Sequence, residues 1–154
     1  MSAFLYNFGF FTLLAYSPFV LDLNERGLGY VFFGWGLFLA ITSVFTAPAV
    51  QRAIGTVRSL IMLFILFAAD LLVLGVWTEH MAVVIAAIVI GGGILGMVNT
   101  ILTTAVMEAA PVERSVASSA YSSIRFIGGA IAPWLAGVLA DHYSAHAPYF
   151  ASAV

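Results

Sequence analysis

Residues 81–106 read MAVVIAAIVIGGGILGMVNTILTTAV, a run of 26 residues without a single charged side chain. A helix needs about 20 mainly apolar residues to cross the hydrocarbon core of a bilayer, so this run is long enough to span a membrane. The whole chain agrees, because 63% of its residues are hydrophobic and 8% are charged, with a mean hydropathy of +1.10. Soluble domains carry about 25% charged residues. The sequence therefore predicts an integral membrane protein.

Short clusters of charged residues divide the chain into five apolar stretches of spanning length. The predicted spans are residues 3–21, 28–50, 59–77, 81–106 and 116–140. The connections between them are too short for a soluble domain, so we expect one all-α transmembrane domain over residues 1–154. YFASAV (149–154) is expected to begin a sixth helix that is truncated, because six helical residues rise only about 9 Å. A cleaved signal peptide is not expected, since no Lys or Arg precedes the first span.

The arginines predict the orientation of these spans, because short cytoplasmic loops retain positive charge. Arg52, Arg58 and Arg114 lie in the second and fourth loops. The first loop holds only Arg26, and the third and fifth loops hold no arginine. The even-numbered loops and the N-terminus are therefore expected in the cytoplasm.

Residues suited to catalysis or to nucleic-acid binding are scarce in this sequence. No Lys occurs, the net charge is −2, and no basic run is present, so nucleic acid is not expected as a partner. The absence of Cys excludes disulfides and thiol chemistry. All three histidines lie in predicted loops, and no hydrolase or phosphate-binding motif is found. We predict neither an enzymatic function nor a cofactor or a bound metal.

Small and polar side chains recur at helical spacing in two of the spans. In the span at 81–106, one helix face carries four such residues at intervals of four, three and four positions. They are Gly92, Gly96, Asn99 and Thr103. The first span repeats the pattern with Gly9, Thr12 and Tyr16, together with Asn7 nearer the cytoplasmic end. Each face is either the wall of a substrate path or a site of close helix packing. Packing is the favoured interpretation for the glycines, and both interpretations are equally favoured for Asn99.

Two ionisable residues lie deep within the predicted spans, Asp70 in the third and Arg125 in the fifth. A charge at the centre of a helix costs at least about 2.5–3.5 kcal/mol on insertion scales, so each side chain should face protein or water. Asp70 has only apolar neighbours along its helix. A protonated, packed or snorkelling carboxyl fits its position as well as a functional carboxyl does, and an ion pair with Arg125 is a further alternative. Arg125 shares its face with Ser118, Ser122 and Gly129, which leave space for the guanidinium to reach a partner.

Pro133 interrupts the backbone bonding of the fifth span and is expected to bend it near Gly129. The surrounding sequence GGAIAPWLAG (128–137) resembles the antiporter motif of the major facilitator superfamily. That motif consists of a glycine, three residues, glycine-proline, two residues and two glycines. The matching positions here are Gly128, Ala132, Pro133, Ala136 and Gly137, with two alanines in place of glycine. The stretch PAVQRAIGTVRS (48–59) is similar to the family's cytoplasmic loop motif through Arg52, Gly55 and Arg58.

The resemblance implies that the chain is the C-terminal half of such a transporter, with helices seven to eleven and the start of twelve. The intact loop motif and the fourth-helix arginine of a first half are absent. The chain is most similar to the drug:proton antiporters of the bacterial inner membrane. This implies proton-coupled efflux of drugs or other small amphipathic organic molecules by alternating access, together with an N-terminal half as partner.

In such transporters the first and fourth spans line the central cavity. The resemblance therefore implies that the substrate path includes Asn7, Thr12, Tyr16, Asn99 and Thr103. It also implies that Asp70 lies on a peripheral helix, where it is a secondary candidate for proton binding. We predict that Arg125 projects toward the cavity and bonds acceptors across it, and its alternative role is to hold the helices of this half together. The alternative function is a non-transport membrane subunit or scaffold that binds a partner through small-residue helix faces.

Overall fold

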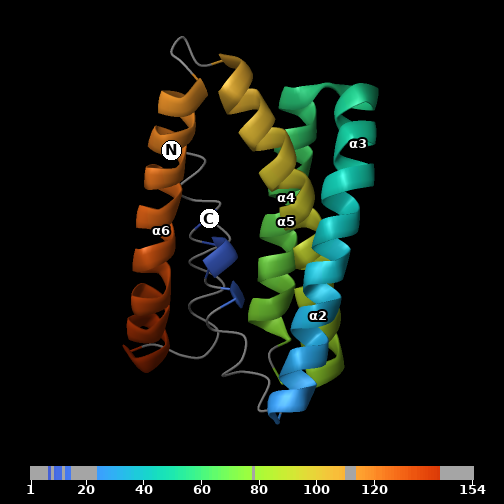
Figure 1. Ribbon diagram of the computed structural model, residues 1–154. Helices are drawn as coiled ribbons and strands as arrows, with labels where there is room; N and C mark the ends of the chain where they lie inside the picture. The colour runs from blue at the N-terminus through green and yellow to red at the C-terminus, as the bar shows by residue number, and fades with distance from the viewer. Residues whose placement is uncertain are drawn as a thin grey trace.

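The computed structural model describes residues 7, 9–11, 13–14, 24–77, 79–109 and 114–142. The elements are α2 (Glu25–Ile41), the π-helical turn η1 (Thr42–Thr46), α3 (Ala47–Ile54), α4 (Thr56–Val76), α5 (Met81–Ala109) and α6 (Arg114–His142). The described residues between positions 7 and 14 are also helical. Within these ranges there is no strand, and the predicted all-α class is confirmed (Figure 1). Outside the described residues lie Thr12, Tyr16, most of the span predicted at 3–21, and YFASAV.

Local sequence explains where these helices begin and end. The side-chain oxygen of Asn24 accepts a hydrogen bond from the Gly27 amide at 2.8 Å, and this bond caps the start of α2. Gly55 alone separates α3 from α4, with a φ of +83° that a glycine adopts without strain. The polar stretch 51–58, predicted as a loop, is therefore helical except at Gly55. An apolar run in the sequence marks only the part of a helix that would lie in the hydrocarbon core. In the structure the helices continue beyond these runs into the polar residues that follow or precede them.

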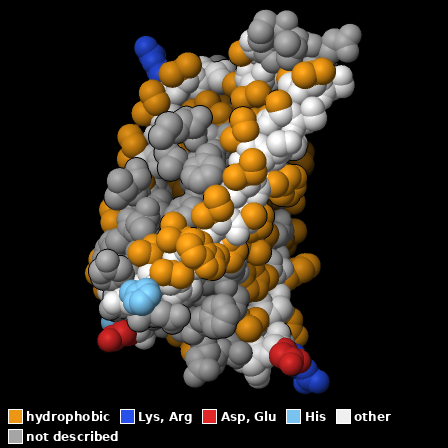
Figure 2. Space-filling model, turned by 90° about the vertical axis from the view of Figure 1, so that its left-hand side faces the viewer, with side chains coloured by type: hydrophobic (Ala, Val, Ile, Leu, Met, Phe, Trp, Pro, Cys, Tyr) orange, Lys and Arg blue, Asp and Glu red, His pale blue; other side chains and the backbone are white. Residues whose placement is uncertain are grey.

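The helices are long and apolar enough to cross a bilayer. The candidate spans are Glu25–Ile54, Thr56–Val76, Met81–Ala109 and Ser115–Leu139. At 1.5 Å per residue, α4 extends about 31 Å, close to the hydrocarbon thickness of about 30 Å. Large hydrophobic side chains such as Tyr30, Phe45 and Trp134 are exposed on the surface. Figure 2 shows hydrophobic side chains over the middle of one face, with its charged and histidine side chains at the upper and lower ends.

The contact between α2 and α5 is close because glycines line it. A Cβ atom at Gly96 would lie 2.4 Å from the backbone oxygen of Leu39, and one at Gly92 would lie 2.7 Å from that of Trp35. Thr42 adds a bond across the same contact, since its hydroxyl lies 2.8 Å from the carbonyl oxygen of Gly93. The glycine face of α5 therefore packs backbone to backbone against α2, as small residues do in membrane bundles.

Helix α6 stands apart from the group formed by α2, α4 and α5, and the described N-terminal residues lie between them (Figure 1). A Cβ atom at Gly9 would lie 2.8 Å from the ring of Phe67 on α4. On the other side, a Cβ atom at Gly129 of α6 would overlap the ring of Phe11, at 2.4 Å. The N-terminal segment thus contacts both α4 and α6 through positions that have no side chain.

Candidate substrate-path site

The guanidinium of Arg125 is bonded to two asparagines from different segments of the chain. Its Nη1 atom donates to Oδ1 of Asn99 on α5 at 2.9 Å, and its Nε atom donates to Oδ1 of Asn7 at 3.4 Å. The amide nitrogen of Asn7 in turn donates to the backbone carbonyl of Arg125. Asn7 is only 1% exposed, whereas Asn99 and Arg125 are half-buried. These three residues form a polar cluster that joins the N-terminal segment, α5 and α6.

The cluster fixes a cation in place without neutralising it. Both partners of Arg125 are neutral amides, and no carboxylate pairs with it in the part of the chain that the structure describes. A guanidinium has five N–H donors. The bonds to Asn7 and Asn99 use two of these donors. Among the described residues, these two amide oxygens are the side-chain acceptors bonded to the guanidinium.

Tyr121, one turn before Arg125 on α6, belongs to the same site. The guanidinium carbon of Arg125 lies 5.8 Å from the centre of the Tyr121 ring, within the range of a cation–π interaction. The tyrosine is 7% exposed, and its hydroxyl has no partner among the described residues. Sequence reasoning missed Tyr121, although its spacing of four residues from Arg125 puts both on one helix face.

The structure brings together only part of the predicted substrate path. Thr103 is half-buried one turn beyond Asn99 and takes no part in the bonds of the cluster. Thr12 and Tyr16 fall outside the described residues. The predicted path residues that contact one another are Asn7, Asn99 and Arg125.

Asp70 lies elsewhere, buried between α4 and α5. It is 8% exposed, and its Oδ2 atom has no hydrogen-bond partner among the described residues. A Cβ atom at Gly91 of α5 would lie 2.7 Å from this oxygen. Within the described ranges Asp70 and Arg125 form no ion pair, because Arg125 is bonded to amide oxygens instead.

The two stretches that resemble family motifs differ in how far their residues are buried. In α6, Ala132 and Ala136 are buried, whereas Pro133 is exposed and the helix continues through it. Gly128 belongs to the same helix, and a Cβ atom at Gly137 would meet only open space. In the other motif, Arg52 and Arg58 are exposed on either side of Gly55, and the Nε atom of Arg52 donates to the carbonyl oxygen of Pro48 at 3.1 Å.

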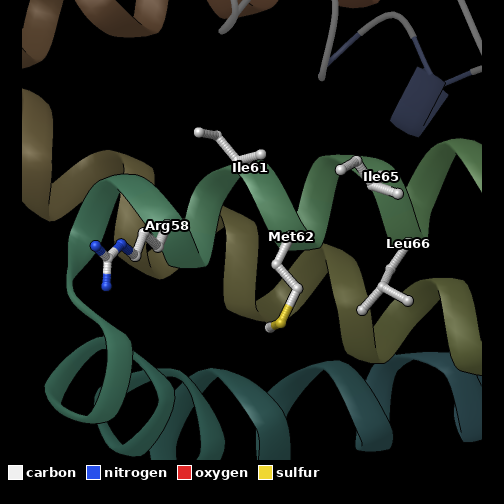
Figure 3. Close-up of a pocket in the computed structure, with 5 residues that line it drawn as sticks. All are labelled: Arg58, Ile61, Met62, Ile65 and Leu66. Atoms are coloured by element: carbon white, nitrogen blue, oxygen red, sulfur yellow. The ribbon is translucent and has the colours of Figure 1, made fainter.

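A shallow groove of about 330 Å³ runs along α4, away from the Arg125 cluster. Its lining residues are Arg58, Ile61, Met62, Ile65 and Leu66. In Figure 3, Ile61 and Ile65 point to one side of the helix, Met62 and Leu66 point to the other, and Arg58 lies at the end. Apart from Arg58 this lining is apolar, so the groove offers a surface for hydrocarbon rather than a polar binding site.

These features define a multi-pass helical membrane protein whose half-buried cation is bonded to neutral amides within the described residues. Ionisable groups inside a membrane are typical of transport proteins. The family model of the Major Facilitator Superfamily matches residues 1–154, and the chain belongs to this superfamily. The resemblance drawn from the sequence motifs is thereby confirmed. Because this is a family of transporters, the prediction that the chain is not an enzyme is also confirmed.

A curated relative is the multidrug efflux protein YfmO of Bacillus subtilis (strain 168). It is 72% identical over 149 residues, which are 97% of this chain and 38% of the relative. The chain therefore spans well under half of the length of the relative that it matches.

Proposed function

We propose that this chain is the second half of a secondary active transporter that exports drugs or other small amphipathic organic molecules. The observation that carries the proposal is its 72% identity, over nearly its whole length, to a protein named for multidrug efflux. In this proposal the chain pairs with an N-terminal half, and the two halves alternate in exposing a site between them to either side of the membrane. Uptake of protons drives the export.

The Arg125 cluster is proposed to form part of the substrate path. The guanidinium is held by Asn7 and Asn99 and keeps donors that neither residue occupies. Carbonyl, ether and anionic groups of amphipathic molecules accept hydrogen bonds from such donors, while the ring of Tyr121 offers an aromatic surface to their apolar parts. The path is proposed to continue over Thr12, Tyr16 and Thr103.

The test of transport is a reconstitution in liposomes. This chain is incorporated alone and together with the N-terminal half of the Bacillus subtilis relative, and uptake of a fluorescent cationic dye is followed under an imposed pH gradient. We expect flux only when both halves are present, because one half supplies one wall of the path. Flux by this chain alone would point to a homo-oligomeric transporter, and no flux with both halves would contradict the efflux proposal.

The proposed location is the bacterial cell membrane, with Arg52, Arg58 and Arg114 on the cytoplasmic side. The chain contains no Cys, so a single introduced cysteine is the only thiol in this chain that a labelling reagent can modify. A cysteine at position 79 or 142 should react with an impermeant reagent added to intact cells, and one at position 52 should not. Reaction at 79 or 142 only after the cytoplasmic side is opened would contradict this topology.

A further inference from the structure

The groove on α4 has a charged end and an apolar body. Arg58 lies at one end, and the rest of the lining consists of four apolar side chains that are 38–64% exposed, namely Ile61, Met62, Ile65 and Leu66. These four point to two sides of the helix in Figure 3, with Arg58 beyond them. From Arg58 to Leu66 the helix rises about 12 Å. The groove therefore leads from a cation onto an apolar surface.

Arg58 lies near the boundary of the hydrocarbon core. It is the third residue of α4, which begins at Thr56 directly after Gly55. Because α4 is about as long as the core is thick, its first turn lies at the level of the lipid headgroups. The apolar lining residues follow one to two turns deeper. The polarity along the groove thus has the same order as in a phospholipid, which is charged at the boundary and apolar beneath it.

The positive charge at this end of α4 is not neutralised by the residues that the structure describes. The guanidinium of Arg58 is exposed and has no hydrogen bond or ion pair among them, whereas the Nε atom of Arg52 is bonded to a backbone oxygen of its own helix. Residues 26–69 include no Asp or Glu, and the N-terminus of α4 adds its own partial positive charge. The acidic residue of α5 is Glu108, which is exposed and forms no ion pair with Arg58, and Glu113 lies outside the described residues. An anion is therefore the complementary partner.

The combination of an anion with hydrocarbon identifies the occupant as a lipid with an acidic headgroup. A guanidinium forms paired hydrogen bonds with phosphate oxygens. A zwitterionic headgroup offers the same phosphate but adds a cation, so its net attraction to Arg58 is weaker. A soluble anion would gain nothing from the apolar lining, and an apolar helix would leave Arg58 without an acceptor.

We propose that this groove binds an acidic phospholipid, with the phosphate at Arg58 and one acyl chain along the apolar lining. Basic sites at the cytoplasmic ends of transmembrane helices attract acidic lipids through the same charges. Under the proposed topology the lipid belongs to the cytoplasmic leaflet. The site is separate from the Arg125 cluster and does not depend on the proposed transport function.

The test places a fluorophore beside the apolar end of the groove and measures its quenching by lipids. Ala69 is exposed and follows Ile65 by four residues, so Ala69→Cys carries the label on the same face of α4. The labelled chain is reconstituted in phosphatidylcholine vesicles that contain increasing fractions of phosphatidylglycerol or phosphatidylcholine with brominated acyl chains. We expect half-maximal quenching at a fraction of the acidic lipid about fivefold lower, because the attraction of one arginine to an acidic lipid surface has about this size. Equal half-maximal fractions of the two lipids would overturn the proposal.

Matched variants separate a lipid site from a general attraction between the membrane and a positive surface. Arg58→Gln should abolish the preference for the acidic lipid, and Arg58→Lys, which keeps the charge, should retain it in part. Arg52→Gln removes the same charge from a residue outside the groove and should leave the preference unchanged. An equal loss of the preference in Arg58→Gln and Arg52→Gln would overturn the site.

A second labelled position tests where the acyl chain lies. Ile41→Cys places the label at an exposed position of α2 that is fourteen residues before Gly55, as Ala69 is fourteen residues after it, so both labels lie at similar depth. We expect no preference for the acidic lipid at position 41. The same preference at both positions, or no quenching at position 69 by either lipid, would contradict binding in the groove. None of these measurements requires transport, so failure of the efflux assay leaves them separately interpretable.

Discussion

Two of the contacts that helix α5 makes, with α2 and with α6, are built in opposite ways. Toward α2 it presents Gly92 and Gly96, where an added Cβ atom would lie 2.7 Å and 2.4 Å from the backbone oxygens of Trp35 and Leu39. Toward α6 it extends the side chain of Asn99, which reaches the long side chain of Arg125. The first contact depends on shape and leaves no room for sliding. The second depends on hydrogen bonds, which can be exchanged for others.

This difference indicates which parts of the bundle move together. Small-residue packing holds α2 and α5 as one unit, and Asp70 and Gly91 bring α4 against the same helix. A change in the position of α6 requires the exchange of acceptors around Arg125 and a shift of the Phe11 ring that packs on Gly129. We therefore expect substitutions in the first contact to affect stability and substitutions in the second to affect transport.

The largest expected effect on stability comes from Gly96→Ala. The added Cβ atom would lie 2.4 Å from the backbone oxygen of Leu39, which cannot rotate away, so we expect a loss of about 2–3 kcal/mol in the free energy of unfolding. Gly36→Ala is the matched control, because a Cβ atom there meets nothing within 4 Å. Unfolding in detergent micelles, followed by circular dichroism, measures both variants. Equal stability of the two would show that the contact between α2 and α5 is not close.

The second contact is broken by Arg125→Gln and Arg125→Lys. Glutamine keeps hydrogen bonding without charge, and lysine keeps the charge without the planar fork of donors. In the complete transporter we expect the transport rate to fall at least tenfold in both, equivalent to about 1.4 kcal/mol, while Ser119→Ala leaves it unchanged. Normal transport in both Arg125 variants, or failure of the protein to accumulate, would contradict the role in the path.

The sequence predicted the helical class and the approximate spans because long apolar runs have no alternative to helix in a bilayer. It did not predict the π-helical turn at Thr42–Thr46. The hydroxyl of Thr42 lies within hydrogen-bond distance of the carbonyl oxygens of Phe38 and Leu39 on its own helix and of Gly93 on α5. The π-helical turn accompanies a hydrogen bond from Thr42 to a residue 51 positions away. The sequence near Thr42 therefore does not predict this turn.

The site could be predicted residue by residue but not as a cluster. Helical spacing singled out Asn7 and Asn99, and the cost of a charge inside a membrane singled out Arg125 and Asp70. Asn7 and Arg125 are 118 positions apart, and no local spacing relates them. The same limit applies to Asp70, whose surroundings depend on Gly91 of another helix.

Thr42→Val tests a single bond within the first contact. Valine keeps the shape of threonine and removes the hydroxyl that bonds Gly93 across the helices. Measured interhelical hydrogen bonds in membranes average about 0.6 kcal/mol and reach about 1.7, so we expect a loss within this range. Ser119→Ala removes a bond within exposed α6 and should cost less. A loss in Thr42→Val no larger than that in the control would mean that glycine packing alone holds α2 to α5.

The smallest effect concerns the hydrogen bond between Ser43 of η1 and Thr100 of α5. Its two hydroxyls are half-buried, and each single replacement also changes helix propensity and burial, so single variants cannot isolate the bond. A double-mutant cycle with Ser43→Ala and Thr100→Val cancels those effects and leaves the coupling energy, which we expect to be about 0.6 kcal/mol.

A matched cycle on α6 uses Ser119→Ala and Ser123→Ala. The hydroxyl of Ser123 donates to the backbone oxygen of Ser119 rather than to its side chain, so this cycle should give a coupling energy near zero. Unfolding in detergent micelles measures both cycles. Coupling in the Ser43 cycle that does not exceed the α6 value would show that this hydrogen bond does not stabilise the packing of η1 on α5. The hydrogen bond of Thr42 to Gly93 would then be the polar interaction left to test between these two segments.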